Sequence, residues 1–376
     1  MKDKPIPSAN PSAGYQSRKK EIDDAIHNTL NSGRYILGDN VQAFEFEFSK
    51  YVGASYGIGV ASGTDAIRLA IMACGIGRGD HVVTVSQTAV ATVSAIIQAE
   101  ATPVLVDIDE ETYTIDIDCL ISTLRNRRDL NIKAIVPVHL YGNTASMNSI
   151  MRLAAENGLY VIEDCAQAHG ATINEKRVGA IGDLGAFSFY PTKNMAALGD
   201  SGAIVTNNKN LYEAIMMLRQ YGWRKRYISE TPGINSRLDE LQAAVLKVKL
   251  NYLEQDNMRR RSIADHYYEG LSNSHLSLPK QQESHRHVFH QFVVRTPQRD
   301  SLQTFLEEKN IYTSVLYPKP IHLQPGYASL ITRGEGGLEV TEKICSELLC
   351  LPIYPELTDE DVDYICKMIL DWDQKQ

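Results

Sequence analysis

The stretch Val161-Ile162-Glu163-Asp164-Cys165-Ala166-Gln167-Ala168-His169 passes from apolar residues through two acids into small and polar residues. Its apolar start predicts a short buried strand that ends near Asp164. In parallel α/β sheets, ligands bind beyond the carboxyl ends of the strands, so an acid at this point faces a binding crevice. An alternative interpretation is that Asp164 caps a following helix.

Similar short apolar runs, separated by helical patterns, occur on both sides of this stretch. They cover residues 57–60, 81–85, 103–106, 134–138, 160–162 and 203–205. This alternation is typical of βα units around a mostly parallel sheet with helices on both faces. After about residue 240, long helical patterns dominate, with one strand-like run at 289–294. We therefore expect an α/β large domain in residues 1–245 and a smaller α+β domain in residues 246–376.

The composition is that of an ordinary globular protein, with 43% hydrophobic and 22% charged residues and a formal net charge of -8. Lys and Arg are spread along the chain, which argues against nucleic-acid binding. No run reaches the ~18 apolar residues of a membrane-spanning helix, and the chain starts with polar sequence. The six cysteines show no zinc-ligand spacing. We therefore expect reduced thiols, no metal site and a cytoplasmic location.

A small-residue turn, Ala61-Ser62-Gly63-Thr64-Asp65-Ala66, separates a predicted strand from an apolar helix. Free backbone N–H groups at a helix start, with hydroxyls beside them, favour binding of an anion such as phosphate. A simple N-cap by Ser62 or Thr64 explains the same residues. A Walker-type loop is excluded because no Gly-Lys-Ser/Thr ending is present, and the dinucleotide fingerprint is missing too.

The stretch Gly185-Ala186-Phe187-Ser188-Phe189-Tyr190-Pro191-Thr192-Lys193-Asn194 places a lysine among glycine, serine and aromatic residues. Most lysines are solvated, but a desolvated lysine near a cationic ring has a lowered pKa and becomes a good nucleophile. The spacing from Asp164 allows a strand, a loop and a return to the same sheet edge. Ser188 is then placed to add a hydroxyl to a phosphate.

These pieces together describe partners for a phosphate, a protonated ring nitrogen and a carbonyl carbon. Asp164 can keep a pyridine nitrogen protonated, as pyridoxal phosphate requires, and Gln167 can bond the phenolic oxygen of the ring. A further polar stretch, Gly233-Ile234-Asn235-Ser236-Arg237-Leu238-Asp239-Glu240, precedes a predicted helix and suits an N-terminal cap.

With these motifs in view, the chain resembles the DegT/StrS-type sugar aminotransferases. These are fold-type I enzymes that use pyridoxal phosphate to put an amino group on nucleotide-linked keto-sugars. The resemblance runs from about Tyr35 to Pro355. Besides the Ser62 turn, the Asp164 stretch and the Lys193 stretch, it rests on the segments at 32–38, 235–237 and 317–324.

The resemblance implies a role for each matching residue. Lys193 carries the cofactor and moves a proton, while Asp164 faces the pyridine nitrogen. The implied cofactor-binding residues are Ser62, Gly63, Thr64, Gln87, Asp164, Gln167, Ser188, Lys193 and Asn235. Asn235 would reach the phosphate of a neighbouring subunit, which implies a homodimer with shared active sites. The residues expected toward the substrate are Tyr190, Tyr221, Tyr317 and His322.

One departure from the family concerns the residue that covers the cofactor ring. Many members have a stacking aromatic residue where this chain has Ala89, and Gln87 is the nearest candidate to replace it. The stretch at 88–92 is similar to the subgroup that aminates C3 of dTDP-3-keto-6-deoxyhexoses, with L-glutamate as the implied donor. The alternatives are amination at C4 of a 4-keto sugar and a non-catalytic regulatory protein. A dehydratase is disfavoured, because those relatives replace the lysine with histidine.

Overall fold

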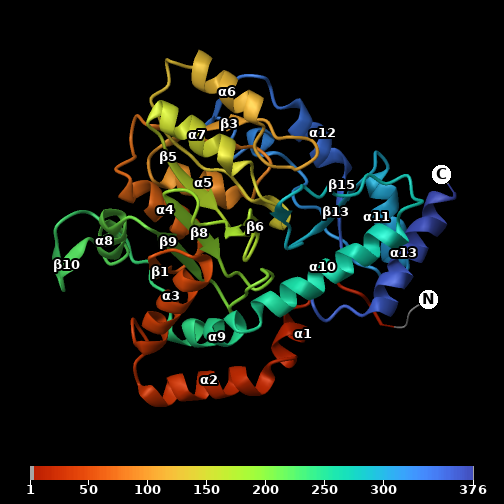
Figure 1. Cartoon of the computed structure of the whole chain (residues 1–376), viewed down its shortest axis with the longest axis horizontal. Coiled ribbons are helices and arrows are strands. Elements are labelled where there is room, and N and C mark those ends of the chain that lie inside the picture. Colours follow the sequence, from red (N-terminus) through yellow and green to blue (C-terminus); the bar gives the residue numbers. More distant parts are fainter. Residues whose placement is uncertain (1–3, 376) are drawn as a thin grey trace.

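The computed structural model describes residues 4–375, in which a central sheet of eight strands has the order β1-β9-β8-β5-β4-β2-β3-β14 (Figure 1). Its strands are β1 (Tyr56–Val60), β2 (His81–Val85), β3 (Thr102–Val106), β4 (Ile132–Ile135), β5 (Tyr160–Asp164), β8 (Leu184–Ser188), β9 (Gly202–Thr206) and β14 (Thr332–Arg333). From β14 to β8 all neighbours are parallel, whereas β9 is antiparallel to both β8 and β1. The predicted mostly parallel sheet is confirmed.

Helices cover both faces of this sheet because alternate strand residues point to opposite sides. On β5, Val161 belongs to one apolar core and Ile162 to another. The core of Val161 includes residues of α3 (Asp39–Val52), α6 (Ile117–Asn126), α7 (Met147–Asn157), α9 (Glu240–Leu250) and α12 (Glu339–Glu347). The core of Ile162 includes residues of α4 (Gly63–Ala73), α5 (Val90–Gln98) and α8 (Lys209–Leu218).

The C-terminal part builds an apolar core of its own, as expected for an α+β unit. Its main elements are α10 (Leu253–Gly270), β13 (Phe292–Arg295), α11 (Arg299–Glu308), β15 (Leu348–Leu351) and α13 (Asp359–Asp373). The long helix α10 leads into this part from below the sheet (Figure 1). The chain also returns to the main sheet through β14, which pairs with β3. The division at residues 245 and 246 stays a prediction.

The polar stretch before α9 does not act as predicted. Asp239, at the N-cap position, makes no capping bond. Instead the carboxylate of Glu240 accepts the N–H groups of Asn40 at 3.0 Å and Val41 at 2.9 Å, so it caps the start of α3. A side chain at Gly38 would meet that carboxylate at 2.8 Å and would push it away from the helix start. The cap prediction was therefore wrong about which helix is capped.

The remaining elements are short or lie at the ends of the described chain. They are α1 (Pro11–Gln16), α2 (Lys19–Ser32), η1 (Leu140–Gly142), η2 (Ile321–Leu323), β6 (Thr172–Ile173), β7 (Lys176–Arg177), β10 (Trp223–Lys225), β11 (Ile228–Ser229) and β12 (His285–Arg286). Within residues 4–375, no helix has the length and apolar character needed to span a bilayer.

Candidate active site

Asp164 ends β5 as a buried carboxylate with few hydrogen-bond donors. Thr92 of α5 donates its hydroxyl to Oδ2 at 2.8 Å, and the Ala166 N–H donates to Oδ1 at 3.1 Å. Thr88 bonds the Thr92 hydroxyl at 2.8 Å. Burial raises the pKa of Asp164, and these bonds and the charge of Lys193 oppose that rise. No helix begins at this point, so the capping interpretation does not hold.

Lys193 lies in the loop that follows β8, and its side chain is partly buried. Burial lowers its pKa to about 8, while the carboxylate of Asp164 acts in the opposite direction. Each group therefore lies within electrostatic reach of the other, as the sequence predicted. An amine with this pKa is partly unprotonated near neutral pH, which makes it competent as a nucleophile and proton carrier.

Gln167 has a fixed orientation beside this pair. Its Oε1 accepts the backbone N–H of Tyr141 at 2.7 Å, and its Nε2 donates to the Tyr317 hydroxyl at 3.1 Å. Because a backbone N–H can only donate, the amide cannot be flipped. The NH₂ end therefore faces Tyr317 and has a second hydrogen to give, which fits a phenolic oxygen of a bound ring.

The small-residue turn at 61–66 lies against the end of β8. Ser62 caps α4 by accepting the Asp65 N–H at 3.1 Å, which confirms the N-cap interpretation for this side chain. A Cβ at Gly63 would lie 2.6 Å from the Cβ of Ser188, so the two predicted phosphate segments touch. Gly63 and Thr64 occupy the first turn of α4, where backbone N–H groups favour an anion.

Gln87 is buried directly after β2, and both ends of its amide are bonded within the protein. Its Nε2 donates to the Tyr141 hydroxyl at 2.9 Å, and its Oε1 accepts the Cys345 thiol at 2.7 Å. Ala89, two residues further, precedes α5 and offers only a methyl group. The amide of Gln87 is thus held by residues from distant parts of the chain.

The residues expected toward the substrate fall into two groups. Tyr317 joins the site through Gln167, and burial raises its pKa. His322 is buried, with Ser86 at 2.7 Å from Nδ1 and Glu342 at 2.9 Å from Nε2, so both ring nitrogens are occupied.

The other group, Tyr190 and Tyr221, is exposed. The carbonyl of Tyr190 accepts the Lys193 N–H at 2.8 Å, so this residue adjoins the site. Tyr190 is 52% exposed on the loop that carries Lys193. Tyr221 is 40% exposed and packs against Trp223 at the base of the β10–β11 hairpin. Asn235 is exposed and bridges to Gln220 next to Tyr221.

Sequence reasoning missed three residues that hold the site together. Thr92 was noted only as part of a family motif; it lies in the first turn of α5, and Thr88, just before that helix, bonds its hydroxyl. Tyr141 and Cys345 gave no local signal. Tyr141 takes a left-handed backbone with φ 61°, and Cys345 is nearly 260 residues from its partner in the chain.

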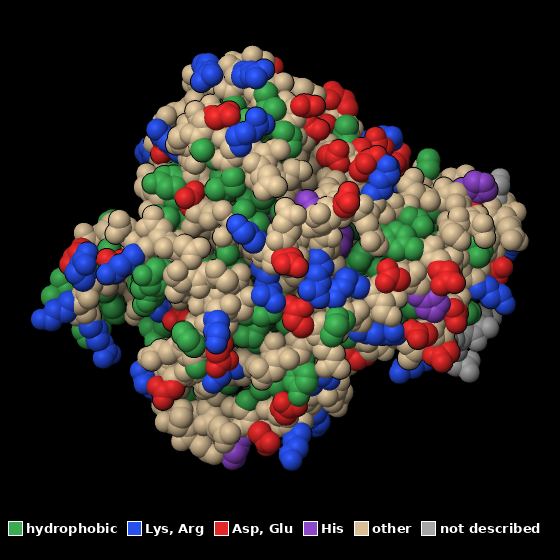
Figure 2. Space-filling model, viewed as in Figure 1, with side chains coloured by type: hydrophobic (Ala, Val, Ile, Leu, Met, Phe, Trp, Pro, Cys, Tyr) green, Lys and Arg blue, Asp and Glu red, His purple; other side chains and the backbone are tan. Residues whose placement is uncertain are grey.

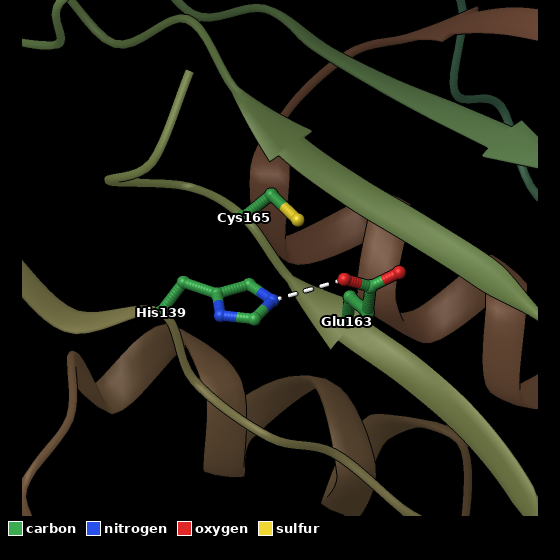
Figure 3. A group of neighbouring side chains, drawn as sticks. All are labelled: His139, Glu163 and Cys165. Carbon is green, nitrogen blue, oxygen red and sulfur yellow. Dashed lines mark hydrogen bonds and ion pairs between the residues drawn. The ribbon is translucent and has the colours of Figure 1, made fainter. Parts of the chain in front are cut away.

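His139, Glu163 and Cys165 lie close enough together to suggest a metal site (Figure 3). However, the Glu163 carboxylate already accepts three backbone N–H groups of residues 179–182 at 2.7–2.9 Å. His139 accepts the Ala145 N–H at Nδ1, so its Nε2 carries the proton that is donated to Glu163 at 3.0 Å. We therefore interpret the group as a structural cluster of hydrogen bonds that ties β5 to the loop at 179–182.

Comparison with known proteins identifies the family. The model of the DegT/DnrJ/EryC1/StrS aminotransferase family matches residues 16–370. The chain belongs to this family. It is therefore an aminotransferase that depends on pyridoxal phosphate. The residues of this site fit that cofactor. Asp164 has few donors, Gln167 has a free amide hydrogen, α4 begins beside Ser188, and Lys193 has a lowered pKa.

Individual relatives of this aminotransferase share most of its length. A dTDP-3-amino-3,6-dideoxy-alpha-D-galactopyranose transaminase of Aneurinibacillus thermoaerophilus is 47% identical, covering 93% of this chain and 95% of its own. A pleiotropic regulatory protein of Geobacillus stearothermophilus is 42% identical, covering 98% of each chain. The crystal structure of S. venezuelae DesV in complex with a ketimine intermediate has a TM-score of 0.94 and 40% identity, covering 98% of this chain and 99% of its own.

Proposed function

We propose that this aminotransferase moves an amino group from L-glutamate to C3 of a dTDP-3-keto-6-deoxyhexose and so forms a dTDP-3-amino-3,6-dideoxyhexose. The substrate class is supported by the transaminase of Aneurinibacillus thermoaerophilus, whose name contains a dTDP-3-amino-3,6-dideoxyhexose. The observation that supports the chemistry is the pair formed by the buried Asp164 and the partly buried Lys193, in which each group shifts the pKa of the other.

Each residue of this pair has a distinct task in the proposed reaction. Bound pyridoxal phosphate supplies an electron sink for cleavage of the C–H bond next to the amino group. Asp164 holds a proton on the ring nitrogen, because a buried carboxylate short of donors favours a cation beside it. The free amine of Lys193 takes the proton from the amino-bearing carbon of glutamate and later returns one to C3 of the sugar.

We propose that the remaining residues hold the cofactor. Gln167 donates its outward NH₂ to the phenolic oxygen, and Gly63 and Thr64 offer N–H groups to the phosphate, with the Ser188 hydroxyl beside them. Ser62 keeps α4 in place through its cap. We propose that Tyr190, Tyr317 and His322 lie on the side of the site where the sugar nucleotide binds. Both ring nitrogens of His322 already have partners, so its proposed role rests on its position and not on a free ring nitrogen.

We propose a homodimer with shared active sites as the working form. Apolar side chains are exposed on the face formed by α2, α3 and the segment between them: Leu30, Tyr35, Ile36 and Phe46, at 45–69%. The β10–β11 hairpin projects from the body of the protein and carries exposed cations at Arg224, Lys225 and Arg226 (Figures 1 and 2). We propose that the exposed Asn235 and Tyr221 near this hairpin serve a partner's site rather than their own.

A cytoplasmic location also belongs to this proposal. The six cysteines all carry free thiols, and four of them are buried. Free thiols of this kind persist in a reducing compartment.

The test is direct assay of the protein with defined sugars. The enzyme is incubated with glutamate and dTDP-3-keto-6-deoxyglucose, its galactose isomer or a dTDP-4-keto-6-deoxy sugar, and products are identified by mass. We expect amination of a 3-keto sugar. Turnover of the 4-keto sugar alone would overturn the C3 assignment but keep the cofactor chemistry. Cofactor binding without turnover of any keto-sugar would favour the regulatory alternative.

A further inference from the structure

Gln87 lies between the two residues that serve opposite edges of the proposed ring. On one side it adjoins Thr88, whose hydroxyl chain through Thr92 ends on Asp164. On the other side it bonds the hydroxyl of Tyr141, whose backbone N–H bonds Gln167. The segment that carries Gln87 is therefore fixed relative to both the ring-nitrogen partner and the phenolic-oxygen partner.

The amide of Gln87 has no freedom to turn. The Tyr141 hydroxyl donates to the Leu316 carbonyl, so it can only accept from Gln87, which identifies the Gln87 nitrogen. Burial raises the pKa of the Cys345 thiol to about 12, so the thiol keeps its proton and donates it to the Gln87 oxygen. Donor and acceptor ends are thus assigned independently, and the two assignments agree.

We propose that Tyr141 and Cys345 are positioning residues that clamp the Gln87 amide by its two ends, so that its planar face covers the cofactor ring in place of an aromatic side chain. This inference rests on the proposed pyridoxal phosphate site. With both ends bonded, the amide has its flat π face left to offer to a ring. Ala89 is too small to fill that space.

The clamp also connects separate parts of the protein. Tyr141 follows β4, and Cys345 belongs to α12 in the C-terminal part of the chain. All three side chains are at most 2% exposed. A loss of either clamp residue leaves one end of a buried amide without a partner, which is unfavourable for that group.

The chain offers a matched control for each clamp residue. Tyr113 is a buried tyrosine that packs edge-on against Tyr141 at 5.7 Å between ring centres, and its hydroxyl is not part of the clamp. Cys366 is a buried thiol in the separate C-terminal core. Tyr113→Phe and Cys366→Ala therefore remove the same atoms without touching Gln87.

The experiment measures cofactor binding rather than activity alone. Apo forms of the full chain are titrated with pyridoxal phosphate, and the pH dependence of the visible band of the bound cofactor is recorded. We expect Tyr141→Phe and Cys345→Ala each to weaken binding by about five- to tenfold, the loss of one hydrogen bond to the Gln87 amide, and to shift the pH profile. Cys345→Ser keeps a donor and should restore both, while Tyr113→Phe and Cys366→Ala should leave both unchanged.

A double-mutant cycle separates positioning from general destabilisation. In a Gln87→Ala background, Tyr141→Phe should have no further effect on binding or on the pH profile. An undiminished effect in that background, or controls that match the clamp variants, would overturn the clamp while wild-type binding still supports the proposed site. Failure of the wild-type chain to bind pyridoxal phosphate would instead remove the proposed function, and the clamp with it.

Discussion

Two adjacent acids of β5, Glu163 and Asp164, have opposite surroundings. Glu163 is fully buried and accepts three backbone N–H groups and one from His139 (Figure 3). Asp164 is almost as deeply buried but accepts only the Thr92 hydroxyl and one backbone N–H. Strand alternation sends the two side chains to opposite faces, so one anchors the loop behind the sheet and the other faces Lys193.

The comparison shows that burial alone does not decide whether an acid has a functional role. A carboxylate with all its acceptor sites filled is part of the structure, because its negative charge is already compensated by donors. A buried carboxylate that accepts few hydrogen bonds still attracts a further cation, such as a protonated ring nitrogen. The number of donors around an acid thus separates a structural residue from a functional one better than burial does.

The largest effect is expected from Lys193→Ala. The variant should fold as well as the wild type but lose turnover by about 10⁴-fold, since it removes both the nucleophile and the proton carrier. The visible absorbance of the lysine-bound cofactor should vanish as well. Turnover near the wild-type level in this variant would show that the chemistry lies elsewhere.

Asp164→Asn should lower turnover by about 10²–10³-fold, the usual cost of one electrostatic partner of the reacting group. The amide oxygen can still accept from Thr92 and only the 3.1 Å bond from the Ala166 N–H is lost, so the thermal midpoint should fall less than in Glu163→Gln. Steady-state kinetics and thermal unfolding of the same preparation check both expectations. A variant that is inactive because it unfolds would show that Asp164, like Glu163, is a structural residue.

Glu163→Gln should show the reverse pattern. The new NH₂ group faces backbone donors, which leaves buried groups unpaired and costs about 2–4 kcal/mol of folding free energy. The folded fraction should keep most of its kcat because the Asp164 side of the strand is untouched. Urea unfolding gives the free energy, and kcat is measured below the transition. A large fall in kcat with unchanged stability would contradict the structural assignment.

The sequence predicted the strands of the main sheet and the residues near Asp164 well. Five of the six strands predicted for the main sheet overlap the observed strands closely, and Asp164, Gln167, Ser188 and Lys193 come from stretches that meet at one sheet edge. This works because strand ends and glycine turns are local features. The predicted run at 134–138 is observed as the strand Ile132–Ile135 followed by an isolated parallel bridge between Val138 and Asp164, so pairing continues beyond the strand in a less regular form.

The sequence could not predict which groups donate hydrogen bonds to each acid. The three N–H groups on Glu163 come from a loop 16–19 residues away, and the Cys345 bond to Gln87 spans 258 residues. The helix that Glu240 caps lies 200 residues earlier. Such partners depend on how the chain closes on itself, and residue type alone does not encode them.

The lowered pKa of Lys193 predicts a pH dependence of stability in the apo protein. The unfolded chain holds this proton up to about pH 10.5, whereas the folded chain releases it near 8. Between these values the unfolded state binds more protons, so stability rises with pH, by at most about 1.4 kcal/mol per pH unit. The difference in unfolding free energy between wild type and Lys193→Met isolates this group. A flat difference from pH 8 to pH 10 would mean that the amine is solvated.

The smallest effect concerns two serines that the sequence treated alike. Ser62 already accepts the Asp65 N–H, so Ser62→Ala should cost about 1 kcal/mol of stability as a lost N-cap and leave the affinity for pyridoxal phosphate nearly unchanged. Ser188→Ala should do the opposite, because that hydroxyl lies beside Gly63 and makes only one long bond, 3.4 Å, to the Tyr190 N–H. Cofactor titration and thermal unfolding of both variants make the comparison. If Ser62→Ala weakened cofactor binding as much as Ser188→Ala, a hydroxyl with a filled bond would still serve the site, and counting partners would not separate the two classes.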